Sequence, residues 1–241
     1  MTRLQSALIT DFVVQVKNKL YIIGIAVAIL VALALSQLAN PSVLSIWVPS
    51  LMLLAVGSTT LLYVSGMVIF EKDEGTLNAI IVSPLRPSEY LWSKIITLTL
   101  LATVESIVMI GGTMLIFSLS FNLTWPNIPI LLLGIIAIGM IYTLIGIILV
   151  VRFDTITDFL IPMAALAVPL QIPVLYFLGV IDSPVLLLIP TSAPTILMQG
   201  AYTAIPNWHW IYGIGYSALM IIGLTIWAYR AFDTHIVRKV G

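Results

Sequence analysis

The sequence predicts an all-α, polytopic membrane protein with six transmembrane helices, and three observations support this class. Of the 241 residues, 61% are apolar and only 20 carry a formal charge, too few to cover a water-soluble surface. Six apolar runs each reach about 20 residues, the length that crosses a hydrocarbon core. The basic residues, finally, fall on one side of these runs. We expect residues 1–241 to form a single transmembrane domain.

Composition also excludes several classes of function. The formal net charge is zero, so the basic face that a nucleic acid would require is missing. The chain has no cysteine, which excludes disulfides and thiolate metal sites. Its two histidines, His209 and His235, lie far apart and lack the spacing of metal ligands. We therefore predict no catalytic residue and no metal site, and the chain is expected to be a transport subunit and not an enzyme.

Residues 1–19 show the pattern of an amphipathic helix. Leu4, Leu8, Phe12 and Val16 recur every four residues, and charged residues such as Asp11 fall elsewhere on the helix. A helix of this kind lies along the membrane surface, in contact with lipids. The alternative is a frayed amphipathic leader without stable structure.

The six predicted spans follow from the apolar runs between charged or turn-forming residues. They cover residues 20–38, 47–70, 95–119, 128–151, 159–178 and 211–229. A cleaved signal peptide is the competing interpretation of the first run. The long charged segment before it and its full span length favour a membrane helix.

The distribution of positive charge predicts the orientation of the chain. With alternating sides, all ten basic residues fall on the cytoplasmic side, which makes both termini cytoplasmic. These residues are Arg3, Lys17, Lys19, Lys72, Arg86, Lys94, Arg152, Arg230, Arg238 and Lys239. The six tryptophans lie near the predicted ends of the spans, where indole rings prefer the membrane interface. We expect a multi-pass protein of a prokaryotic plasma (inner) membrane.

The connection at residues 71–94 is the most highly charged part of the chain, with seven of its 20 charges. We expect the second span to enter water at Glu71 and a break at Ser83–Pro84, because proline ends helices. Pro87 is typical of a new helix start. Gly75 removes a side chain, which permits a bend or the close approach of another protein surface.

At these residues the sequence resembles the membrane subunits of ATP-binding-cassette exporters, the ABC transporter type 2 permease family. The family has an acidic residue four positions before Gly-Thr-Leu, a Ser-Pro or Thr-Pro some eight residues later, and Gly-Lys at the start of the third span. The matching residues are Glu71, Gly75, Thr76, Leu77, Ser83, Pro84 and Lys94. Ser93 departs from the pattern, since the family usually has glycine there.

The resemblance implies that this connection docks on a separate ATPase subunit and transmits force to the membrane helices. Glu71, Gly75, Thr76, Leu77, Ser83 and Pro84 would form the ATPase-coupling contact. ATP and Mg would bind the ABC ATPase subunits, because this chain contains no G-x-x-x-x-G-K-[ST] phosphate loop. A second copy, or a similar permease, would complete the pathway. The alternative is a solvated acidic loop without a partner.

Polar residues inside the predicted spans are candidates for the substrate pathway. Glu105 lies 11 residues after Lys94, about 16 Å along a helix and near the bilayer centre. Ser58, Thr59 and Gln171 are further candidates, although hydroxyl and amide side chains also serve helix packing. The first span carries a stripe of small residues at Gly24, Ala28 and Ala32, which indicates a helix contact. Repeated prolines around Gln171 predict a kinked fifth span.

The outer segment at residues 179–207 is apolar and broken by prolines, so it is too interrupted to cross the membrane twice. We expect two short re-entrant helices at residues 185–189 and 195–201, as the family resemblance implies. They would form a lid over the exit, or else a loop along the surface.

The function that these features favour is an ATP-driven exporter permease for a hydrophobic or amphiphilic cargo, drug-like or lipid-like. Within the same family, haem or glycan export remains open. A proton-coupled secondary transporter that uses Glu105 is the alternative from a different class, although the inverted repeats typical of such transporters are not evident. A membrane scaffold without transport activity is a third possibility.

Overall fold

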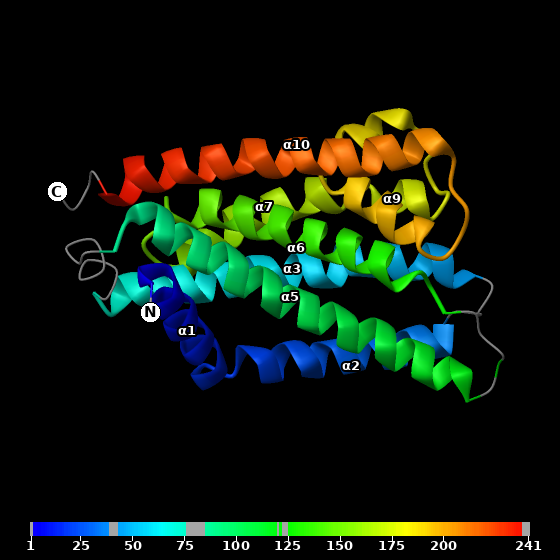
Figure 1. Ribbon diagram of the computed structural model, residues 1–241, viewed down its shortest axis with the longest axis horizontal. Coiled ribbons are helices and arrows are strands. Elements are labelled where there is room, and N and C mark those ends of the chain that lie inside the picture. Colours follow the sequence, from blue (N-terminus) through cyan, green and yellow to red (C-terminus); the bar gives the residue numbers. More distant parts are fainter. Residues whose placement is uncertain (1, 39–42, 76–84, 120, 122–124, 238–241) are drawn as a thin grey trace.

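The computed structural model describes residues 2–38, 43–75, 85–119, 121 and 125–237, and all regular elements in these ranges are helices (Figure 1). Six of these helices are long and apolar enough to span a membrane, which confirms the predicted fold class. They are α2 (Leu20–Leu38), α3 (Leu44–Asp73), α5 (Pro87–Ser118), α6 (Ile128–Val150), α7 (Ile156–Gln171) continued by α8 (Val174–Phe177), and α10 (Asn207–Phe232).

Helix α1 (Arg3–Lys17) precedes the first span and crosses one end of the bundle (Figure 1). A reciprocal cap starts it, in which Thr2 and Gln5 each accept from the other's backbone N–H. The apolar side chains of Phe12 and Val16 are exposed, whereas Asp11 is buried. The expected amphipathic helix is present, with Asp11 and Gln15 turned into the protein and apolar side chains on its exposed face, while its location along the membrane surface stays a prediction.

Helix α2 packs against α5 through its small residues. Ala28 and Ala32 are buried, and a Cβ atom on Gly112 of α5 would lie 3.2 Å from the Cβ of Ala32. Small side chains let two helix backbones approach closely. The predicted contact stripe on the first span is therefore confirmed.

Helices α3, α5 and α6 form the packed centre of the bundle. Glycines set the separation of α3 and α6: a Cβ on Gly57 would lie 2.3 Å from the ring of Tyr142, and one on Gly146 would lie 3.0 Å from Val64. The buried Tyr142 hydroxyl donates to the backbone carbonyl of Leu53, 3.2 Å away. By contrast α2, α7 and α10 expose much of their apolar surface, and Ile161 of α7 is 80% exposed.

The fifth span is interrupted, as its prolines predict. Helix α7 contains Pro162 and Pro169, ends at Gln171, and is followed by the short helix α8 after Pro173. A proline lacks a backbone N–H and clashes with the preceding turn, which breaks the hydrogen-bond ladder. The kinked span predicted at residues 159–178 is therefore divided into two helical pieces.

Two short helices connect α8 to α10. A 3₁₀ helix, η2 (Pro184–Leu188), is followed by α9 (Ser192–Gly200), which starts three residues earlier than predicted. Helix α9 is buried against α6 and α10 at the end of the bundle opposite α1 (Figure 1). The hydroxyl of Thr191 donates to the carbonyl of Leu170 at 2.6 Å and ties this connection to α7. The position of these helices relative to the membrane stays a prediction.

The start of α1 and the end of α10 lie at one end of the bundle (Figure 1), together with the end of α3, the start of α5 and the turn between α6 and α7. The described lysines and arginines belong to these helix ends. We call this end of the molecule the basic end. A π-helical turn, η3 (Asp233–Val237), extends α10 there. The arrangement agrees with the charge asymmetry, while the cytoplasmic location of this end remains a prediction.

Candidate functional site

The connection after α3 contains the predicted coupling residues. Helix α3 continues to Asp73, three residues beyond the predicted end of the second span, and the expectation that the chain enters water at Glu71 stays a prediction. Gly75 ends the helix with a left-handed φ of 68°, and its N–H donates to the carbonyl of Lys72. A Cβ on Gly75 would meet no described atom within 4 Å, so its left-handed backbone explains the glycine. Thr76, Leu77, Ser83 and Pro84 lie outside the described residues.

The side chain of Glu71 turns inward to α5. Its carboxylate pairs with the ammonium of Lys94 and accepts from the Tyr90 hydroxyl at 2.6 Å. Only 13% of the Glu71 side chain is exposed. Glu71 and Lys94, the first and last residues of the motif, are thus directly paired. The role of Glu71 as a contact for another protein stays a prediction.

Lys94 is the centre of a buried polar cluster that sequence reasoning missed. Its side chain is 1% exposed, and Nζ lies 2.6 Å from Oδ1 of Asp11 in α1. Ser93 donates to Oδ2 of the same aspartate at 2.5 Å. We call Asp11, Glu71, Tyr90, Ser93 and Lys94 the Lys94 cluster. The resemblance leads one to expect glycine at position 93. The serine found there instead donates a hydrogen bond to Asp11.

One signal in the sequence pointed to Asp11. It is the single acidic residue of the amphipathic segment at residues 1–19, and Gln15 follows one helical turn later. Both side chains are buried. Charged residues on a surface helix are normally solvated, so the pattern alone favoured the opposite orientation.

Lys72 holds a second junction at the basic end. Its ammonium donates to the carbonyls of Val151 and Phe153 at 3.2 and 2.6 Å, and it lies 3.3 Å from Asp154. These carbonyls follow the end of α6, where a helix leaves acceptors without intrahelical partners and attracts a cation. The end of α3 is thereby attached to the turn between α6 and α7.

Inside the bundle, Glu105 of α5 meets Thr59 of α3. The Thr59 hydroxyl lies 3.0 and 3.1 Å from the two carboxyl oxygens. Glu105 is 2% exposed, and a Cβ on Gly24 of α2 would lie 3.4 Å from Oε2 and 2.9 Å from the Tyr63 hydroxyl. A carboxyl group therefore sits among hydroxyls where three helices meet, and glycine provides the space for it.

Ser58 and Gln171 form a separate pair on another face of α3. The Gln171 amide donates to the Ser58 hydroxyl at 2.8 Å, and Ser58 donates to the carbonyl of Leu54. Adjacent residues on a helix point about 100° apart, so Ser58 faces α7 and Thr59 faces α5. The four predicted pathway residues thus form two pairs on different faces of α3, and the structure does not unite them in one site.

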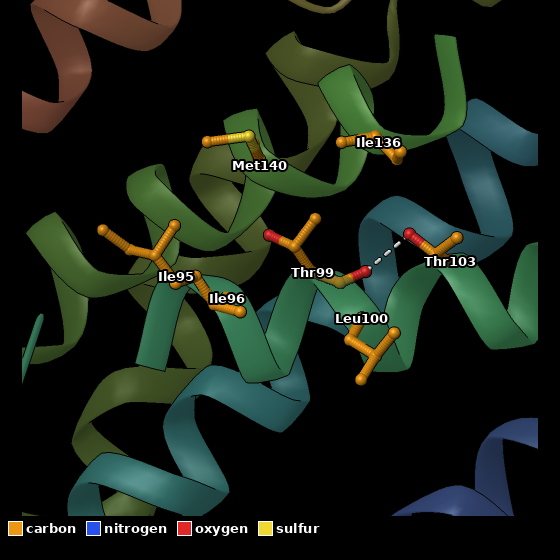
Figure 2. Close-up of a pocket in the computed structure, with 7 residues that line it drawn as sticks. All are labelled: Ile95, Ile96, Thr99, Leu100, Thr103, Ile136 and Met140. Atoms are coloured by element: carbon orange, nitrogen blue, oxygen red, sulfur yellow. Dashed lines mark hydrogen bonds between the residues drawn. The ribbon is translucent and has the colours of Figure 1, made fainter. Parts of the chain in front are cut away.

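A cavity of about 310 Å³ opens between α5 and α6, and sequence reasoning missed it (Figure 2). Its lining is almost entirely apolar: Ile95, Ile96, Thr99, Leu100, Thr103, Ile136 and Met140. The Thr103 hydroxyl donates to the Thr99 carbonyl at 2.7 Å, whereas the buried Thr99 hydroxyl has no hydrogen-bond partner among the described residues. Cavities of this volume are at the lower limit for drug-sized ligands.

Comparison with known proteins places this bundle in a family. Residues 2–240 match the fluoroquinolones export permease protein family. The chain belongs to this family. Fluoroquinolones export permease proteins from two strains of Mycobacterium tuberculosis, CDC 1551 / Oshkosh and ATCC 25618 / H37Rv, are each 31% identical to it over 254 aligned residues. The alignments cover 100% of this chain and 99% of each relative.

Membership in the fluoroquinolones export permease family covers the Lys94 cluster, the Glu105 pair and all six spans, because the match extends over nearly the whole chain. It makes the chain a multi-pass membrane permease and a transport protein. The family does not by itself assign a role to any single residue of the sites described above.

Proposed function

We propose that this chain is the membrane subunit of an ATP-driven exporter that moves amphiphilic, drug-like molecules out of a prokaryotic cytoplasm. Its family membership over residues 2–240 is the observation that carries the proposal. Fluoroquinolones, named in that family and in its mycobacterial relatives, are the first cargo to test. Such molecules combine a flat aromatic body with polar groups, and a permease for them needs an apolar path with few hydrogen-bonding sites.

The energy source is a separate ABC ATPase. This sequence contains no phosphate-binding loop of the G-x-x-x-x-G-K-[ST] type, so this chain lacks the common motif for hydrolysing ATP. The resemblance of the connection between α3 and α5 to ABC type 2 permeases supports a docking role for Gly75 and the residues that follow it. A second permease, identical or similar, would complete the pathway, and the exposed apolar faces of α2, α7 and α10 are available to lipid or to that partner.

Two features suit an amphiphilic cargo. The cavity between α5 and α6 is apolar apart from its threonines, and Glu105 supplies a carboxyl group deeper in the bundle. A charged group far from water is unfavourable unless it is paired or hydrogen-bonded, so Glu105 is the polar residue whose replacement tests the pathway most directly.

The test is reconstitution of the permease with its partner ATPase in proteoliposomes. We expect fluoroquinolone transport that requires ATP and stops when the phosphate-loop lysine of the ATPase is replaced. Glu105→Gln keeps the shape of the side chain and should change the relative transport rates of different drugs, with insertion into the membrane retained. Thr113→Val, on α5 but outside the cavity lining and the Glu105 pair, is the matched control for the loss of a buried polar group.

The same liposomes separate the alternatives. Transport by the permease alone, driven by a pH gradient and lost in Glu105→Gln, would favour a proton-coupled secondary transporter and contradict the ATP-driven proposal. ATP-dependent export of haem or a lipid-linked glycan, with no movement of fluoroquinolones, would retain the exporter and replace the cargo.

A further inference from the structure

Three helices converge on the ammonium group of Lys94 at the basic end. Lys94 lies at the end of the second turn of α5 and pairs with Asp11 of α1 and with Glu71 of α3. The two carboxylates come from two different helices, α1 and α3, and each is mostly enclosed, with 10% and 13% of the side chain exposed. One cation therefore joins three separate elements.

Neighbouring contacts extend this junction to a fourth helix. The Tyr90 hydroxyl donates to Glu71, and the Tyr90 ring stacks on Phe232 at the end of α10 with ring centroids 5.1 Å apart. The Lys94 ammonium lies 5.1 Å from the centroid of the same tyrosine ring. The Lys94 cluster is thus supported from the side of α10 as well.

Opening this junction would be unfavourable. A lysine that is 1% exposed has little access to water, so separating it from its carboxylates would leave a buried charge without a partner. A motion that keeps α1, the end of α3 and the start of α5 together avoids this penalty, whereas a motion that slides one past another incurs it.

We propose that α1, the last turn of α3 and the first turns of α5 move as one rigid body during transport, with Lys94 as the positioning residue that holds them together. The connection at residues 74–86 starts and ends on this body, so force applied there also moves α1 at the lipid surface. The proposal rests on the proposed ATP-driven function for its transport readout, and a second measurement below does not require that function.

The first test measures drug molecules transported per ATP hydrolysed in the reconstituted exporter. Asp11→Asn removes one carboxylate charge and should lower this ratio several-fold while ATP hydrolysis continues. Asp158→Asn is the matched control, because Asp158 is an exposed acid at the same end that bonds only locally to Thr155 among the described residues. If Asp11→Asn transported as many drug molecules per ATP as the wild type, the Lys94 cluster would not couple these helices during transport, and the proposal would be overturned.

Covalent rescue makes the test sharper, since the chain has no native cysteine. The double variant Asp11→Cys with Ser93→Cys replaces the hydrogen bond between α1 and α5 by two thiols. A short thiol-specific cross-linker should return the transport ratio to within about twofold of the wild type, because the joined helices move together. Loss of the remaining transport on cross-linking, restored by a reducing agent, would show that α1 must separate from α5 and would overturn the proposal.

The second test needs no transport. Spin labels on Ser6→Cys in α1 and Asp73→Cys in α3, both exposed, report the distance between these helices in lipid nanodiscs. We expect one narrow distance distribution that is the same with and without the ATPase and ATP, and a broad one when Lys94→Met is added. A wild-type distance that changes with nucleotide would contradict a rigid body, whether or not the exported cargo is a fluoroquinolone.

Discussion

At the scale of single residues, small differences in side chain decide how close the helices lie. Gly57 faces the ring of Tyr142, and Gly24 faces the Tyr63 hydroxyl and Glu105. In a membrane, where lipid is as apolar as the helix surface, close packing supplies much of the attraction between helices. These glycines therefore contribute to helix packing as much as the large side chains they contact.

We expect Gly57→Ala to destabilise the protein by about 1–3 kcal/mol, the usual range for overpacking. The added Cβ would lie 2.3 Å from Cζ of Tyr142, which is fully buried and has little room to move. Gly111→Ala is the control, because a Cβ there meets no described atom within 4 Å. The measurement is the thermal unfolding midpoint in detergent, and equal midpoints for both variants would contradict the packing described here.

Gly75 illustrates a different role for glycine. Its φ of 68° is strained for residues with a Cβ, so Gly75→Ala should disfavour the end of α3 by about 1 kcal/mol even though space is available. Asparagine tolerates this conformation better, and Gly75→Asn should therefore retain more of the ATP-dependent transport than Gly75→Ala. Equal transport in the two variants would indicate that the backbone conformation is not the reason for glycine.

At the scale of elements, α3 contacts several of the other helices through polar side chains. Its middle contacts α5 through Thr59 and α7 through Ser58, while its end binds α5 through Glu71 and the turn after α6 through Lys72. A displacement at the end of α3 is thereby passed to α5 and to the turn that starts α7. This arrangement suits a helix that precedes the predicted coupling connection.

Lys72→Met tests the junction between α3 and α6. The variant loses two charge-assisted hydrogen bonds to carbonyls, and we expect a loss of about 1.5–3 kcal/mol in stability. Asp154→Asn should have a far smaller effect, about 0–1 kcal/mol, because the Asp154 side chain is 73% exposed and its ion pair is screened. Chemical denaturation in detergent compares the two, and a larger effect for Asp154→Asn would show that the ion pair holds the junction.

At the scale of the whole molecule, the basic end and the opposite end differ in construction. The basic end carries the ion pairs of Lys72 and Lys94. At the opposite end, Tyr212 and Tyr216 donate to the carbonyls of Leu187 and Leu188, and α9 fills the space beside α6. The ion pairs of the described residues are thus gathered at one end, which is the end that the proposed ATPase would contact.

The orientation of the two ends can be measured with single cysteines in the cysteine-free chain. A membrane-impermeant thiol reagent applied to intact cells should label Asp182→Cys, between α8 and η2, and should leave Asp73→Cys unlabelled until the membrane is permeabilised. Both positions are exposed and carry the same original residue, so each controls for the other. The reverse pattern would place the basic end outside the cell and exclude a cytoplasmic ATPase at the connection after α3.

Sequence reasoning predicted the number of spans, the helix before them, the proline kink in the fifth span and the contact stripe on α2. All of these depend on local features: the length of an apolar run, a four-residue repeat, a proline, a row of small residues. The four pathway residues were chosen individually, and only the pairing of Thr59 with Glu105 and of Ser58 with Gln171 assigned them to two faces of α3.

The span count and the helical class follow from the chain alone, because each apolar segment must satisfy its own backbone hydrogen bonds in lipid whatever its neighbours are. The positions and partners of the few charged side chains do not follow from the chain alone. Asp11 and Lys94 are 83 positions apart, and only the folded bundle brings them within 2.6 Å and away from water. A buried ion pair depends on which helices pack together, and that choice is a property of the whole tertiary structure.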